Sequence, residues 1–243
     1  MATLLNITKS RIIRVGLMIV GVMLIPILVI YLGSRSNGTP QGVGSSNAGS
    51  YAEPTAIPLS WLIPPSHAEV APPPGAVSFC LRNPEQCRSA KGSATSILLT
   101  PAHWLLIERI NSEVNSAIRP QGDISHYDRA EYWIVPIDGY GDCEDYALTK
   151  QKRLLDAGFP LAALRLAIVV TARGNRHAVL TVTTSGGDYV LDNLNALVMP
   201  WAAAQLAWLM RQDLHDPWGW SRMGNGSDIK GILLTGPVSS TCQ

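Results

Sequence analysis

The chain has 243 residues, and its 19 Lys+Arg and 18 Asp+Glu give a net charge of +1. This near balance argues against a broad basic surface, so we expect no nucleic-acid partner. Hydrophobic residues make up 47% of the chain and charged residues only 15%. Such a composition excludes a disordered protein and predicts at least one packed core.

The first recognisable element is an apolar segment near the N-terminus. Residues 15–32 carry no charge, and as a helix they would span about 27 Å, close to the thickness of a bilayer core. Basic residues precede the segment, which favours a cytoplasmic N-terminus over residues 1–14. No small-x-small cleavage site follows closely. We therefore predict an uncleaved transmembrane anchor over residues 15–34. A cleaved signal peptide and a buried core helix are the alternatives.

An anchor or a signal peptide would export the rest of the chain to an oxidising compartment, which bears on its four cysteines. Cys80 and Cys87 are close in sequence and are predicted to form a local disulfide. Cys242 has no obvious partner. A zinc site is not expected, because no second pair of cysteine or histidine residues has a suitable spacing.

A linker is predicted over residues 35–76. Its first part is rich in Gly, Ser and Asn, and its second part is rich in Pro and ends in Pro72-Pro73-Pro74. These compositions are typical of a flexible tether followed by a stiffer, extended spacer. The remaining residues, 77–243, are predicted to form one globular domain.

Hydrophobic periodicity and capping residues predict helices first and strands later in this domain. One helix begins at Thr100-Pro101, with a hydroxyl cap and a proline at the first helical position. A second helix is expected over residues 143–157, three strands over residues 164–171, 176–184 and 188–192, and a last helix over residues 200–214. This order predicts the α+β class, with an antiparallel sheet.

A candidate nucleophile, Cys143, stands at the predicted start of the second helix. The backbone N–H groups and the helix dipole at such a position favour a thiolate and could hold an oxyanion. His177 lies on a predicted strand, and Asp192 ends the next one. Together they are the parts needed for thiolate-based acyl transfer. Taken singly, Cys143 could be a small core residue and Asp192 part of a turn.

The segments GYGDCEDYA, RHAVLTV and YVLDNL, with FCLRNPEQC, EYWIVP and DPWGW around them, resemble the bacterial transglutaminase-like cysteine proteinase family. This family includes the LapG-type periplasmic proteases that release large adhesins from the cell surface. The resemblance covers residues 79–223. It implies a papain-like, transglutaminase-type core with helices packed on an antiparallel sheet. It also implies that Cys143 is the nucleophile, His177 the general base and acid, and Asp192 the residue that orients the histidine.

One detail of the predicted hairpin conflicts with this triad. If Gly186-Gly187 is the centre of the turn, Asp192 lies opposite Thr181. Thr181 is four residues from His177, a distance of roughly 13 Å along a strand. We therefore expect a bulge or a shifted register to bring Asp192 to the histidine.

Three acidic residues, Asp142, Glu144 and Asp145, surround the cysteine in sequence. Carboxylates so close would oppose ionisation of the thiol. One interpretation is structural, with Asp142 as the helix cap and the other two favoured by the helix dipole. The other is a calcium site, since calcium prefers oxygen ligands. The family resemblance implies calcium as the cofactor and Asp142 and Glu144 as its ligands.

The leading functional hypothesis is a membrane-tethered periplasmic cysteine endopeptidase in the inner membrane of a bacterium. Its partner would be an exported or cell-surface protein substrate. A cross-linking transglutaminase and a non-catalytic module that binds a peptide or calcium are the alternatives. Four aromatic residues could line a peptide groove, although a core position is expected for most of them: Trp133, Tyr140, Trp218 and Trp220.

Overall fold

A computed structural model describes residues 62–64 and 68–223 of the chain. The predicted anchor, most of the predicted linker and Cys242 lie outside these residues. Within them, no helix is both long and apolar enough to cross a membrane.

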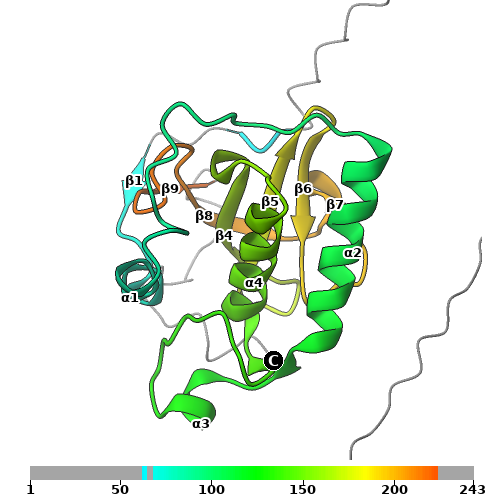
Figure 1. Cartoon of the computed structure of the whole chain (residues 1–243). Helices are drawn as coiled ribbons and strands as arrows, with labels where there is room; N and C mark the ends of the chain where they lie inside the picture. Colours follow the sequence, from blue (N-terminus) through cyan, green and yellow to red (C-terminus); the bar gives the residue numbers. More distant parts are fainter. Residues whose placement is uncertain (1–61, 65–67, 224–243) are drawn as a thin grey trace, which may run out of the picture. The chain divides into compact units, whose positions relative to one another are not determined.

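The centre of the fold is a seven-stranded sheet in which every neighbouring pair of strands is antiparallel (Figure 1). The strands follow the order β1-β9-β8-β4-β5-β6-β7. Their bounds are Glu69–Val70 (β1), Leu164–Val170 (β4), Arg176–Thr184 (β5), Gly187–Leu191 (β6), Met199–Pro200 (β7), Ala207–Gln212 (β8) and Trp220–Arg222 (β9). The two remaining strands, Arg119–Pro120 (β2) and Tyr140–Gly141 (β3), form a separate parallel pair.

Helices pack on one face of this sheet. The described residues form four α-helices, Pro74–Arg82 (α1), Pro101–Ala117 (α2), Asp123–Tyr127 (α3) and Cys143–Asp156 (α4). Helices α2 and α4 lie side by side, and α4 packs against β5 (Figure 1). The Thr100 side chain caps α2 by accepting a hydrogen bond from the backbone N–H of His103 (3.1 Å). This arrangement confirms the α+β class predicted from the sequence.

The two faces of the central strands carry different hydrophobic clusters, because side chains alternate along a strand. Leu180 and Ile168 face the helices and join Leu148 of α4 in the main core. The opposite face carries a smaller cluster of Ala167, Val169, Val179 and Val190, against which Trp201 and Trp208 pack. Both faces of the central strands are therefore buried. This explains the nearly continuous apolar run of β4.

The predicted helix over residues 200–214 is wrong. The structure has a short 3-10 helix, Trp201–Ala203, followed by strand β8. Trp208 packs on one face of the sheet and Leu209 belongs to the core on the other. Because both faces are covered, β8 lacks the alternation of polar and apolar residues that marks a half-buried strand. The alanine-rich stretch before it favours a helix on propensity alone.

Strand β1 and the first residues of α1 lie within residues 35–76, the predicted linker. Strand β1 pairs with β9, and α1 begins at Pro74, where proline suits the first turn of a helix. The predicted disulfide between Cys80 and Cys87 is present, with an S–S distance of 2.02 Å. It joins the end of α1 to the turn that follows.

Candidate active site

The hairpin of β5 and β6 sets the position of Asp192. Thr184 pairs with Gly187 and Leu180 pairs with Leu191, so the turn is centred on residues 185–186 rather than 186–187. Extending this register by one residue places Asp192 opposite Val179, two residues from His177 and on the same face. Diagonal neighbours of this kind are about 7–8 Å apart between Cα atoms, within reach of an imidazole and a carboxylate. The shift of register that we expected therefore brings Asp192 within reach of His177.

His177 and Asp192 are in direct contact at the end of this hairpin. His177 is fully buried, and its Nε2 lies 2.6 Å from Oδ1 of Asp192. The same Asp192 oxygen accepts a hydrogen bond from the backbone N–H of Leu194 (2.9 Å). Asn115 of α2 holds the loop in place by donating to the Asp192 carbonyl oxygen (2.9 Å). His177 and Leu194 thus hold the carboxylate, and α2 holds the backbone of the same residue.

The charge of Asp192 determines which nitrogen of His177 is basic. Burial raises the pKa of Asp192, but the hydrogen bond and the charge of His177, with smaller contributions from Leu194 and Lys150, outweigh burial. The pKa therefore lies below its ordinary value. An ionised Asp192 accepts the proton on Nε2 and thereby leaves Nδ1 as the basic nitrogen. Nδ1 is buried and has no hydrogen-bond partner among the described residues.

Cys143 reaches the same region from the other layer. It is the first residue of α4, is fully buried, and packs in the main core. The last pair between β5 and β6 is Leu180 with Leu191, so β6 does not cover the start of β5. The backbone N–H of Ala178 donates to Sγ of Cys143 instead (3.1 Å). The sulfur therefore lies against the residue that follows His177, in the gap left by the shorter strand.

Acidic side chains surround this helix start. One carboxylate oxygen from each of Asp123, Asp142 and Asp145 lies within 4.8 Å of the others, and all three residues are buried. None of them forms an ion pair with a lysine, arginine or histidine within 4.0 Å in the described part of the chain. Glu144 is not a member of this group, and its Oε2 lies 3.3 Å from Sγ of Cys143.

Burial dominates the electrostatics of these acids. It raises the pKa of Asp142 to about 7, and the charge of Asp123 adds to the rise. Burial and the charge of Asp142 also raise the pKa of Glu144 and of Asp145 well above their ordinary values. Asp145 accepts hydrogen bonds from the backbone N–H of Ile134 (2.9 Å) and of Asp142 (3.3 Å). It therefore joins the start of α4 to the preceding loop.

The structure thus brings His177 and Asp192 into contact and places Sγ of Cys143 against Ala178, the residue that follows His177. It adds Asp123 to the predicted acids, and nothing in the sequence marked that residue. Asp123 lies 19 residues before Asp142 in a short helix, outside any spacing motif, and it is 1% exposed. Its burial, which a single sequence does not reveal at an isolated aspartate, is the property that distinguishes it.

The four aromatic residues divide into two pairs. Trp133 and Trp220 are buried in the core, with ring centroids 6.4 Å apart. Tyr140 and Trp218 are 36% and 39% exposed. Tyr140 lies three residues before Cys143, the first residue of α4. Of the four aromatic residues, it alone is both accessible and close in sequence to the start of this helix.

Comparison with known proteins identifies relatives of this domain. Residues 66–228 match the family model described as bacterial transglutaminase-like cysteine proteinase, BTLCP. The chain is also similar to solved structures of Legionella pneumophila LapG, one of them calcium-bound, at 24% identity and a TM-score of 0.43, over 55% of this chain and 77% of that one. The EGTA-treated form has the same identity and score, over 59% of this chain and 75% of that one. The comparison with curated proteins gives no match.

Proposed function

The chain belongs to the bacterial transglutaminase-like cysteine proteinase family, and from this premise we propose that it is a membrane-tethered periplasmic endopeptidase with a Cys143–His177–Asp192 triad. The contact of 2.6 Å between His177 Nε2 and Asp192 Oδ1 carries the proposal, because it leaves Nδ1 as the base. The position of Cys143 Sγ against Ala178 supports the same assignment. We also propose that the core is of the papain-like, transglutaminase type.

In the proposed reaction, Nδ1 of His177 takes the proton from Cys143, and the thiolate attacks the carbonyl carbon of the scissile peptide. The carbonyl oxygen of the scissile peptide becomes an oxyanion, which the backbone N–H groups at the start of α4 are suited to stabilise. His177 then gives its proton to the leaving amine, and a thioester remains on Cys143. Water, deprotonated by His177, hydrolyses the thioester and restores the thiol. Asp192 holds the imidazole and balances its charge throughout.

Calcium is the cofactor that we propose for the acidic group. Asp123, Asp142 and Asp145 would hold it, since their buried oxygens converge and Oδ1 of Asp123 has no hydrogen-bond partner in the described chain. Hard oxygen donors suit calcium. When bound, calcium would balance the negative charge beside the nucleophile and tie α3 to α4. Glu144, which the resemblance implies as a ligand, is not one of the three acids whose oxygens converge.

The location and the substrate are inferred from the N-terminal segment. An anchor over residues 15–34, followed by the linker, would hold the domain on the periplasmic face of the inner membrane. A tethered peptidase meets proteins that cross or remain at the cell envelope. We therefore propose an exported or cell-surface protein as the substrate.

The test is cleavage by the full-length, reduced protein in detergent. It is incubated with exported proteins of its own host in the presence of calcium, and new N-termini are sequenced. Cys143→Ala and His177→Ala are the matched controls. New N-termini that depend on both residues support an endopeptidase. Isopeptide-linked products without new termini would identify a transglutaminase. Retained ligand binding with no turnover would identify a binding module.

A further inference from the structure

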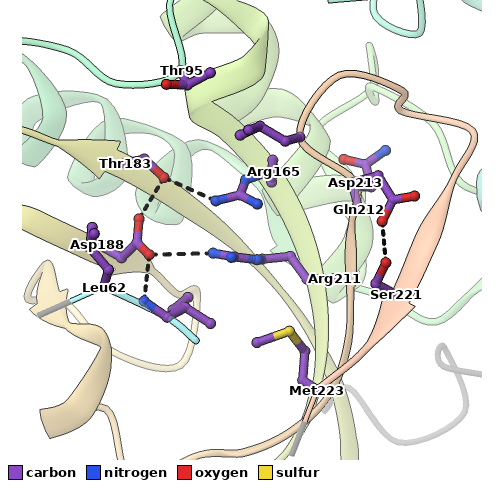
Figure 2. Close-up of a pocket in the computed structure, with 12 residues that line it drawn as sticks. Leu62, Thr95, Arg165, Thr183, Asp188, Arg211, Gln212, Asp213, Ser221 and Met223 are labelled. Carbon is purple, nitrogen blue, oxygen red and sulfur yellow. Dashed lines mark hydrogen bonds and ion pairs between the residues drawn. The ribbon is translucent and has the colours of Figure 1, made fainter. Parts of the chain in front are cut away.

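A second cavity, remote from the triad, lies at the opposite end of β5. Its volume is about 330 Å³, and residues from β4, β5, β6, β8 and β9 line it (Figure 2). Thr183, in its wall, is six residues along β5 from His177, which corresponds to roughly 20 Å. Ligand sites in proteins begin at about 300 Å³, so this cavity can hold a small molecule.

Two arginines from neighbouring strands extend into this cavity. Arg165 belongs to β4 and Arg211 to β8, and both point toward Asp188 and Thr183 (Figure 2). Arg211 Nη1 lies 3.4 Å from Oδ2 of Asp188. The same oxygen accepts from the backbone N–H of Ile63 (2.7 Å), and Oδ1 accepts from the Thr183 hydroxyl (2.5 Å). Both oxygens of Asp188 are therefore already engaged.

Arg165 has no carboxylate of its own. Among the described residues, no carboxylate oxygen lies within 4.0 Å of it. Its Nη2 donates only to the Thr183 hydroxyl (3.3 Å), and its buried Nε has no acceptor. The other acid in the cavity wall, Asp213, accepts from Ser221. Burial and then the charge of Arg211 lower the pKa of Arg165 to about 9, and the charges of Asp188 and Asp213 only partly oppose this shift. Arg165 is therefore a buried guanidinium with no carboxylate at ion-pair distance in the described chain.

We propose that this cavity is a binding site for a small oxyanion, a carboxylate or phosphate group held by Arg165 beside Arg211. A guanidinium offers parallel N–H donors that match the two oxygens of such groups, and its buried Nε would gain the acceptor that it lacks. The ligand would link β4, β5 and β8 at the end of the sheet away from Cys143. The site is therefore separate from the proposed catalytic centre and does not depend on it.

The experiment measures thermal unfolding and calorimetric binding of the full-length protein in detergent. Inorganic phosphate and succinate are titrated separately, against sodium chloride of equal ionic strength. We expect at least one anion to raise the melting temperature in a saturable way. The anion with the smaller dissociation constant shows whether the phosphate or the carboxylate chemistry applies. Equal behaviour of both anions and chloride would overturn the proposal.

Matched variants locate the site. Arg165→Gln should weaken binding about tenfold or more. Arg173→Gln makes the same change of charge in an exposed turn and should leave binding unchanged. If Arg165→Gln does not fold, Arg165→Lys decides: it keeps the charge but loses the two-pronged donor, so weaker binding is expected. Wild-type affinity in a folded Arg165 variant would show that the anion binds elsewhere and would reject this site.

Discussion

Nε2 of His177 lies 2.6 Å from Oδ1 of Asp192, although the turn of a hairpin separates the two residues in sequence. The contact exists because β5 and β6 pair with Leu180 opposite Leu191, so that Asp192 leaves its strand diagonally across from the histidine. A change in either residue should therefore affect the same proposed catalytic unit.

The first prediction concerns this unit as a whole. Cys143→Ala and His177→Ala should each lower kcat/KM at least about 10³-fold, and the double variant should lose little more, because members of a catalytic unit are not additive. The measurement is the rate at which a substrate found in the cleavage experiment is consumed. Full activity in either single variant would exclude the proposed roles.

The second prediction separates the role of Asp192 in orienting His177 from its role in the stability of the fold. Asp192→Asn should lower kcat by about 10²–10⁴-fold, because asparagine no longer balances the charge of the imidazolium. The pKa of Asp192 is depressed in the fold, so its contribution to stability is present above about pH 4 and is lost as the pH falls further. The variant should therefore unfold with a weaker pH dependence below about pH 4, as measured by circular dichroism. An active Asp192→Asn protein would mean that another group orients His177.

The third prediction concerns the acids without calcium. The pKa of Asp142 is raised to about 7, so the folded state holds a proton that the unfolded state releases near pH 4. Stability in EGTA should therefore fall as the pH rises from about 4 to 7. Calcium should reduce this fall, because it favours the ionised carboxylates. The melting temperature, recorded with EGTA and with calcium across this range, tests the sign.

Variants of the acids show which residues matter for calcium. Asp123→Asn should remove most of the stabilisation by calcium, whereas Asp156→Asn, at an exposed position of α4, should keep it. Isothermal titration with calcium gives the affinities. If Asp123→Asn binds calcium as the wild type does, the ligands are other residues, and Glu144 becomes the one to change next.

The fourth prediction concerns the N-terminal segment. Full-length protein should stay with the membrane fraction after extraction in alkaline carbonate, because residues 15–34 are expected to span the bilayer. Recovery of a soluble chain with a new N-terminus would identify a cleaved signal peptide instead.

Sequence patterns predicted the features that depend on neighbouring residues. The start of α4 at Cys143 follows from a cap and a helical pattern, and β4 and β5 follow from β-branched runs. The patterns failed where tertiary contacts decide. Strand β8 was mistaken for a helix because sheet packing covers both of its faces. Asp123 was missed because only the fold brings it to Asp142.

The turn at Ser185-Gly186 sets the register of the hairpin and thereby the position of Asp192 relative to His177, the proposed catalytic contact at its far end. Surface turns usually tolerate insertions, but here one added residue would reverse which face Asp192 presents. We therefore expect this turn to resist any change in length, even though its own side chains take no part in the reaction. A variant with one glycine inserted between residues 185 and 186 should fold and yet lose turnover.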